Sequence, residues 1–156
     1  MKRFILFLLL FLPVISFSQT NYDLLIRNGK IIDGTGNSWY YADVAVKDGM
    51  IVLIQKNIIG NATKIINAEG FIVAPGFIDV HGHIENGLFE RPTADNYIYD
   101  GVTTVITGNC GGSAENLQYF FFKVDSMKTS INVASLIGHN TIRRMVMGND
   151  NRLVTP

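Results

Sequence analysis

Short apolar runs separated by turn residues dominate the chain from residue 22 to residue 72. Two such runs flank the Asn-Gly pair at 28–29, two flank the Asp-Gly pair at 48–49, and two more are separated by Glu-Gly at 69–70. Asn-Gly and Asp-Gly suit the positive φ angles of a type I′ hairpin turn. The pattern predicts a small sheet of hairpins. Because no titratable groups cluster there, we expect a scaffold without chemistry of its own.

After Pro75 the pattern changes, and β-branched runs alternate with longer amphipathic stretches. Strands are predicted within residues 76–84, at 102–108 and at 131–138. Each is followed by a stretch suited to a helix. Three successive β-α units imply a parallel sheet, in either a doubly wound fold or a (β/α)₈ barrel.

The helix ends are predicted from capping residues. Residues 93–100 can form a short helix with Thr93 as N-cap and Gly101 as its stop. Ser113 is the expected N-cap of a longer helix. Glu115 would lie in the first turn of this helix, where an acidic side chain interacts favourably with the helix dipole. A third helix is expected over residues 141–148.

The first 18 residues have the composition of a secretory signal peptide. Lys2 and Arg3 precede an apolar run at 4–12, and small residues stand before the predicted cleavage site after Ser18. The run is shorter than the roughly 20 residues that a membrane-spanning helix needs. We therefore expect export to the periplasm or the extracellular space, without a stable membrane anchor.

Charge and cysteine content narrow the classes of function. The formal net charge is +0, which gives no basic patch for nucleic acid. The chain is 47% hydrophobic with 15 glycines, as in a folded, turn-rich protein. Its single cysteine, Cys110, cannot form an internal disulfide. In an exported protein it is buried and inert, free, or a metal ligand.

Two of the three histidines, His81 and His83, follow a predicted buried strand directly. If the strand continues through them, Asp79 shares their face, because alternate side chains of a strand point the same way. Two imidazoles at the carboxyl end of a parallel strand can bind one divalent ion. Asp79 can then accept a proton from a ligand imidazole and fix its tautomer. The alternative is a pair of structural loop histidines.

Cys110 and His139 follow the next two predicted strands. For Cys110, a zinc-binding thiolate ranks first, a Gly-rich anion cradle at the helix after Ser113 second, and a nucleophile third. His139 is a candidate for substrate binding as a donor to a carbonyl, with metal ligation and helix capping as alternatives that the sequence leaves open.

A family resemblance rests on five stretches of sequence. The order LLIRNGKIIDGTG, DVAVKDGMI, APGFIDVHGHIE resembles the N-terminal part of the amidohydrolase superfamily. GVTTVITGNCGGS and NVASLIGHNTIRRMVMG resemble the N-acyl-D-amino-acid deacylase (D-aminoacylase) family within it. The resemblance implies an α/β fold: a small β-sandwich module over residues 19–73, followed at 74–156 by the first three or so β-α units of a metal-bearing (β/α)₈ barrel.

The resemblance also implies a chemistry. His81, His83 and Cys110 would bind one or two zinc ions, and the reaction would be hydrolysis of N-acyl-D-amino acids to a carboxylate and a free D-amino acid. Glu85, two residues after His83, stands where the family commonly has an acidic residue nearby, often aspartate. Further histidine ligands and the general-base aspartate are expected beyond residue 156.

The length of the chain bears on its activity. A (β/α)₈ barrel needs roughly 250 residues, whereas about three of its eight strands precede Pro156. We therefore expect a leading fragment that is inactive without the C-terminal part of the same chain. Two alternatives are a cyclic-amide hydrolase resembling hydantoinases and dihydroorotases, against which Cys110 argues, and a non-enzymatic secreted module.

Overall fold

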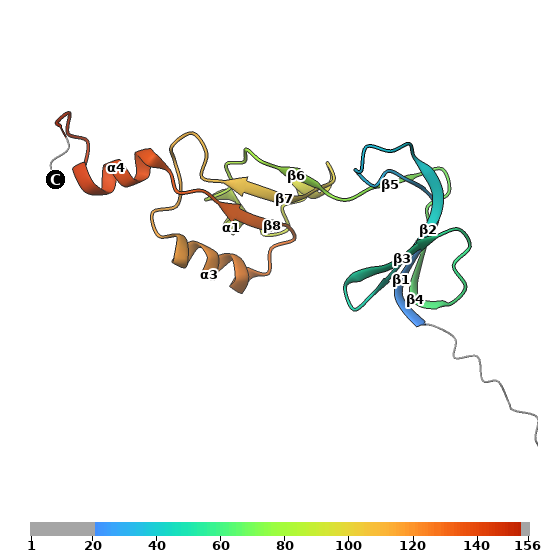
Figure 1. Ribbon diagram of the computed structural model, residues 1–156. Helices are drawn as coiled ribbons and strands as arrows, with labels where there is room; N and C mark the ends of the chain where they lie inside the picture. Colours follow the sequence, from blue (N-terminus) through green and yellow to red (C-terminus); the bar gives the residue numbers. More distant parts are fainter. Residues whose placement is uncertain (1–20, 154–156) are drawn as a thin grey trace, which may run out of the picture. The chain divides into compact units, whose positions relative to one another are not determined.

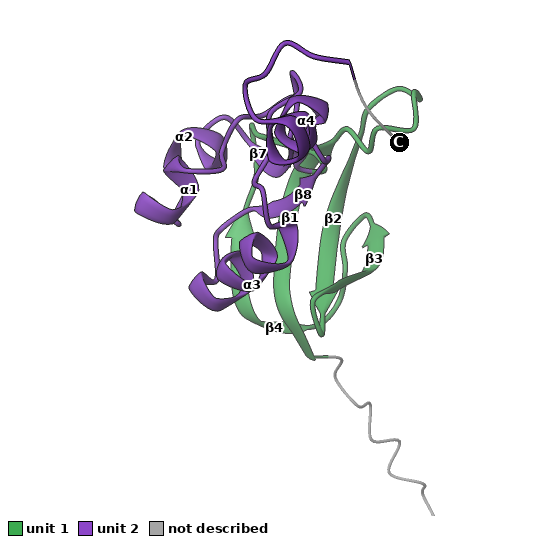
Figure 2. Ribbon diagram, turned by 90° about the vertical axis from the view of Figure 1, so that its left-hand side faces the viewer, with its two compact units in different colours: residues 1–75 green, residues 76–156 purple. Residues whose placement is uncertain are grey.

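The computed structural model describes residues 21–153. The chain divides into two compact units, residues 1–75 and 76–156, shown in different colours in Figure 2. The division follows Pro75, whereas the sequence places it after residue 73. The predicted signal peptide lies outside the described residues, and among those residues no helix is long and apolar enough to cross a membrane.

Unit 1 contains one five-stranded sheet (Figure 1). Its strands are β1 (Asn21–Ile31), β2 (Tyr40–Lys47), β3 (Met50–Gln55), β4 (Asn61–Asn67) and β5 (Ile72–Val73). The order is β3-β2-β1-β4, with β5 also paired to β1. The β1–β2 and β2–β3 pairs are antiparallel, and β4 and β5 run parallel to β1. The described residues of unit 1 include no second sheet, which a sandwich would require.

The predicted turns of unit 1 have mixed outcomes. The hairpin at 48–49 is confirmed, because Asp48 and Gly49 have φ angles of 51° and 74° and join the paired strands β2 and β3. The break at 69–70 separates β4 from β5, but the two strands do not form a hairpin, since each pairs in parallel with β1.

The hairpin predicted at 28–29 is wrong. β1 continues through these residues, and its register with β2 shifts between Ile26 and Gly29. Asn28 has a φ of 61°, and its N–H donates to the buried carboxylate of Asp43 at 2.9 Å. A Cβ on Gly29 would lie 2.6 Å from Cγ2 of Val73. The Asn-Gly pair therefore forms a β-bulge, because contacts distant in the sequence hold it in place.

Unit 2 contains a parallel sheet of the order β6-β7-β8, which confirms the predicted parallel pairing. Its elements are β6 (Phe77–Asp79), α1 (Gly87–Glu90), α2 (Asp95–Ile98), β7 (Val102–Thr107), α3 (Leu117–Met127), β8 (Asn132–Ser135) and α4 (His139–Met147). A cluster of buried apolar residues joins α1, β7 and α3: Ile84, Leu88, Ala94, Val105, Phe120, Val124 and Ile131. This core packs β7, through Val105, against the loop after β6, through Ile84.

The helix starts differ from those predicted. α3 begins at Leu117, and its N-cap is Asn116, whose side-chain oxygen accepts the N–H of Tyr119 at 2.8 Å. Ser113 and Glu115 precede the helix, so their predicted roles as cap and first-turn residue are wrong. Thr93 is not the cap of α2 either, because Ala94, with a φ of 47°, occupies that position.

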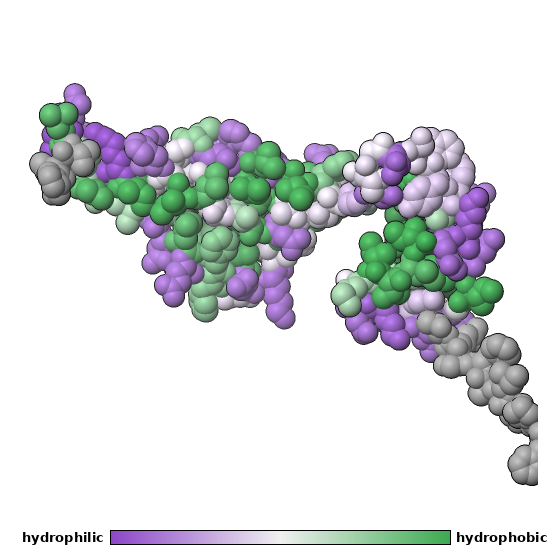
Figure 3. Space-filling model, viewed as in Figure 1, coloured by the Kyte–Doolittle hydropathy of each residue, from purple (hydrophilic) through white to green (hydrophobic). Residues whose placement is uncertain are grey.

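Apolar side chains are exposed on unit 2. Figure 3 shows apolar residues gathered over its sheet and along α4. The residues more than half exposed on and beside the strands are Phe77, Ile78, Val80, Leu136 and Ile137. Parallel sheets in proteins usually have both faces covered.

Candidate metal centre

His81 and His83 lie in the loop that follows β6. The strand ends at Asp79, so the prediction that Asp79 and both histidines share one strand face is wrong. The chain turns because the Asp79 carboxylate accepts the backbone N–H of His81 at 3.0 Å, an interaction that favours a turn two residues on. The two imidazole rings nevertheless lie together, with centroids 5.4 Å apart.

Gly82 lets this loop approach β7 closely. Its N–H donates to the carbonyl of Ile106 at 2.9 Å. A Cβ at this position would lie 2.3 Å from Cγ1 of Val105, which is fully buried. Because Val105 fills the space beside Gly82, only glycine fits between the two histidines without displacing β7.

Cys110 lies in the loop after β7. Its φ of 54° and that of Gly111, 79°, turn the chain back after the strand. The Sγ atom lies 3.1 Å from Nε2 of His81. One donor atom from each of His81, His83 and Cys110 lies within 4.8 Å of the others, and all three residues are exposed. The structure thus brings together the three residues that the sequence singled out as metal ligands.

This donor set fits zinc. Zinc binds imidazole nitrogen at about 2.0–2.1 Å and thiolate sulfur at about 2.3 Å, with four ligands in structural sites and an open position in catalytic ones. Two nitrogens and one sulfur supply three ligands. The separation of 3.1 Å between Nε2 of His81 and Sγ of Cys110 is short enough for both atoms to contact one ion.

The loop of Cys110 is attached to the start of α4. The carbonyl of Gly111 accepts the backbone N–H groups of Asn140 at 2.9 Å and Thr141 at 3.2 Å. Ser113 donates its own N–H to Oγ1 of Thr141 at 3.0 Å, and its hydroxyl accepts the N–H of Gly138 at 3.0 Å. The anion cradle considered for this loop depended on a helix that begins at Ser113, and the helix begins four residues later.

His139 is not brought to the cluster. It is the first residue of α4 and is exposed, and its Nδ1 lies 3.4 Å from the side-chain oxygen of Asn140. It lines a separate hollow along α4 with Ile142 and Val146. The described residues therefore give it no place among the three donors, and its role in substrate binding stays a prediction.

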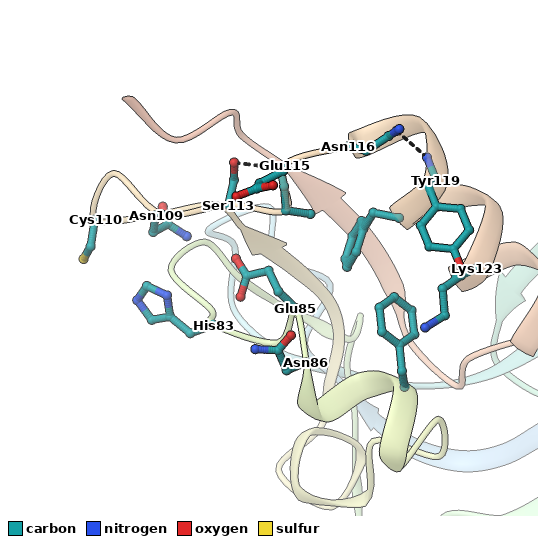
Figure 4. Close-up of a pocket in the computed structure, with 14 residues that line it drawn as sticks. His83, Glu85, Asn86, Asn109, Cys110, Ser113, Glu115, Asn116, Tyr119 and Lys123 are labelled. Carbon is teal, nitrogen blue, oxygen red and sulfur yellow. Dashed lines mark hydrogen bonds between the residues drawn. The ribbon is translucent and has the colours of Figure 1, made fainter. Parts of the chain in front are cut away.

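A cleft of about 650 Å³ opens beside the cluster. Figure 4 shows His83 and Cys110 at one end and Lys123 of α3 at the other, with Glu85 between them. The Lys123 ammonium lies 3.9 Å from the centre of the Phe89 ring. A small molecule in this cleft would lie alongside His83 and Cys110.

Glu85 follows His83 by two residues and lines the cleft. Burial alone would raise its pKa, but hydrogen bonds from the Thr107 hydroxyl and from backbone N–H groups outweigh burial and lower it. Because its pKa is lowered, Glu85 is ionised at neutral pH. Burial raises the pKa of the nearby Tyr97, and the negative charges of Asp79 and Glu85 add to this effect. Thr107, the partner of Glu85, was not predicted, because it is one of three threonines in the β-branched strand β7 and nothing in the sequence distinguishes it from the other two.

The chain is similar to known proteins along most of its length. A profile described as "Amidohydrolase family" matches residues 64–143. A D-aminoacylase of Alcaligenes xylosoxydans xylosoxydans is 32% identical over 157 residues, covering 86% of this chain and 32% of the relative. An adenine deaminase of Bacillus subtilis (strain 168) is 42% identical over 86 residues, covering 54% of this chain and 14% of the relative.

A solved structure is also similar. The N-acyl-D-glutamate deacylase of Bordetella bronchiseptica, complexed with zinc and a phosphonate inhibitor that mimics the tetrahedral intermediate, aligns with a TM-score of 0.77 and 35% identity. The alignment covers 84% of this chain and 32% of that protein, so this chain spans about a third of the length of these deacylases. Since the family profile matches half of its residues, the chain belongs to the amidohydrolase family.

Proposed function

We propose that the protein carrying this chain hydrolyses N-acyl-D-amino acids, with zinc as cofactor, to a carboxylate and a free D-amino acid. The observation that carries the proposal is the convergence of His81, His83 and Cys110 from two neighbouring strand ends. Support comes from the similar D-aminoacylase and N-acyl-D-glutamate deacylase, the second of which was solved with zinc.

Each part of the site would have its own role in this hydrolysis. Neutral imidazoles of His81 and His83 and the thiolate of Cys110 would hold one or two zinc ions. When bound, zinc polarises a carbonyl oxygen and makes hydroxide available at neutral pH. The cleft between the donors and Lys123 would hold the acyl amino acid. An aspartate base and further histidine ligands would come from later strands.

We also propose how the two units extend into the complete fold. The parallel sheet of unit 2 would be the first three strands of a (β/α)₈ barrel, in which functional side chains gather at the carboxyl ends of the strands. The exposed apolar side chains of this sheet favour a covered state. The sheet of unit 1 would form one layer of a β-sandwich.

The test is a set of parallel assays on the purified full-length protein with zinc. N-acetyl-D-methionine and N-acetyl-D-glutamate should be hydrolysed, their L-enantiomers much more slowly, and a hydantoin not at all. A chelator should abolish the activity and zinc should restore it. Hydrolysis of the hydantoin alone would contradict the proposal in favour of a cyclic-amide hydrolase.

A second candidate is deamination of adenine, because the relative with this name has the higher identity over the stretch it shares with this chain. Release of ammonia from adenine, measured on the same preparation, distinguishes the two reactions. Activity on adenine without activity on any N-acyl-D-amino acid would replace the first proposal by the second.

Export is a separate part of the proposal. Cleavage after Ser18 would make Gln19 the first residue of the mature protein. N-terminal sequencing of protein recovered from the medium or the periplasm tests it, and an intact Met1 in a cytoplasmic pool would exclude it.

A further inference from the structure

We infer that Glu85 is a positioning residue of the metal centre: its carboxylate holds the loop that carries His81 and His83 against the loop that carries Cys110. The inference rests on the proposed function, since it takes these three side chains as the metal ligands. Glu85 itself is not among the converging donors.

One oxygen of Glu85 makes both contacts with the second loop. Its Oε1 accepts the Thr107 hydroxyl at 2.6 Å and the backbone N–H of Gly108 at 3.0 Å. Glu85 follows His83 by two residues, and Gly108 precedes Cys110 by two. The carboxylate thus joins the two ligand-bearing segments within two residues of a ligand on each side.

The surroundings of this bridge are rigid. Thr107 is fully buried, and its hydroxyl also accepts the N–H of Ile84 at 3.5 Å. A Cβ on Gly108 would lie 2.1 Å from the carbonyl oxygen of Leu136, so the backbone there is closely packed against the next segment. Glu85 therefore attaches its own loop to a fixed point, and the histidines follow the position of their loop.

The bridge lies beyond the last paired residues of β6 and β7. The β6–β7 ladder ends at the pair Asp79 and Val105, before any of the three ligands. Beyond it, side-chain and loop hydrogen bonds set the separation of the segments, including one of 3.4 Å from the Asn109 amide to the carbonyl of Gly82. Hydrogen bonds to an ionised carboxylate are roughly twice as strong as neutral ones.

The length of the side chain matters as well as its charge. Aspartate at position 85 would carry the carboxylate one methylene short of Thr107 and Gly108 unless the loop moved. Glutamine keeps the length and one oxygen acceptor but loses the charge. The three substitutions Glu85→Ala, Glu85→Asp and Glu85→Gln therefore separate the presence, the reach and the charge of the bridge.

Metal binding by the full-length protein tests the inference. Zinc affinity is measured by competition with a chromophoric chelator, and the geometry at Cys110 by the thiolate-to-metal charge-transfer band of the cobalt form. Loss of a residue that orients a ligand typically costs 10–100-fold in metal affinity. We expect about that loss for Glu85→Ala and Glu85→Asp, with an altered band, and a smaller loss for Glu85→Gln.

Glu115 provides a matched control. It also lines the cleft, but its side chain is 61% exposed and its carboxylate lies 3.6 Å from Arg144, away from the bridge. Glu115→Ala should leave zinc affinity within about twofold of the unsubstituted protein. Thr107→Val should weaken binding as Glu85→Gln does. Thr107→Val and Glu85→Ala should be non-additive when combined, because each removes the contact between the two side chains.

The outcomes are distinguishable. Zinc affinity and a cobalt spectrum unchanged in Glu85→Ala would overturn the positioning role and leave the proposed function standing. Failure of the unsubstituted protein to bind zinc would instead overturn the proposed metal centre. If Glu85→Ala does not fold, Glu85→Gln and Thr107→Val decide, and wild-type affinity in both would contradict the inference.

Discussion

The Nε2 atom of His81 lies 3.1 Å from the Sγ atom of Cys110, although 29 residues separate the two in the chain. Parallel pairing of β6 with β7 brings both strand ends to one edge of the sheet, and the loops that follow carry the donors. A thiol and an imidazole this close either form a hydrogen bond with each other or bind one metal ion together. The family to which the chain belongs favours the metal.

Removal of the thiol should abolish the site. Cys110→Ser replaces a soft thiolate by a hydroxyl that is a poor zinc ligand, so we expect zinc affinity to fall by at least about 100-fold. The cobalt form should lose its thiolate charge-transfer band. Because Cys110 is exposed, the stability of the metal-free protein should change little. An unchanged zinc content after dialysis would exclude Cys110 as a ligand.

His139 should behave differently from the paired histidines. His139→Ala should keep full zinc content, because its ring lies outside the cluster and beside Asn140. His83→Ala should lose most of the metal. Zinc measured by atomic absorption on the two variants makes the comparison. Equal loss in both would show that His139 reaches the metal in the complete protein.

The convergence of His81, His83 and Cys110 could be predicted from sequence because it depends on simple features. Residues just after parallel strands meet at one edge of a sheet whatever the detailed loops. The length of β6 could not be predicted, because the turn at His81 depends on two tertiary and local contacts. The Asp79 carboxylate accepts the N–H of His81, and the N–H of Gly82 donates to the carbonyl of Ile106. The hairpin predicted at 28–29 was wrong for the same reason. Asp43 and Val73, which lie elsewhere in the sheet, determine the conformation of the Asn-Gly pair.

Asp43 should be a major determinant of the stability of unit 1. Its carboxylate is almost fully buried, accepts the N–H groups of Asn28 at 2.9 Å and Ile58 at 3.0 Å, and lies 3.4 Å from the Arg27 guanidinium. Asp43→Ala would leave these donors without their acceptor. We expect a loss of about 2–4 kcal/mol in the free energy of unfolding.

Urea unfolding of this chain, followed by the fluorescence of its one tryptophan, Trp39, measures this loss. Asp23 is the matched control, because its carboxylate accepts one N–H, from Asp48 at 2.6 Å, at an exposed position. Asp23→Ala should cost less than about 1 kcal/mol, as exposed interactions usually do. Similar losses for both variants would mean that burial of Asp43 does not set its contribution.

Gly82→Ala should destabilise unit 2 and disturb the metal site together. The added methyl group would lie 2.3 Å from Cγ1 of the buried Val105, so the loop or β7 must move. Overpacking of this kind costs about 1–3 kcal/mol. Since Gly82 stands between the two histidines, zinc affinity should fall as well.

A second substitution tests this cause. Val105→Ala removes the clashing methyl groups, so the double variant should be more stable than the sum of the two single losses predicts. Gly87→Ala is the control, because a Cβ there meets nothing within 4 Å. Urea unfolding and zinc titration of these four variants and of the unsubstituted protein give both quantities. If the losses in the free energy of unfolding were additive, contact with Val105 would not be the reason why position 82 requires glycine.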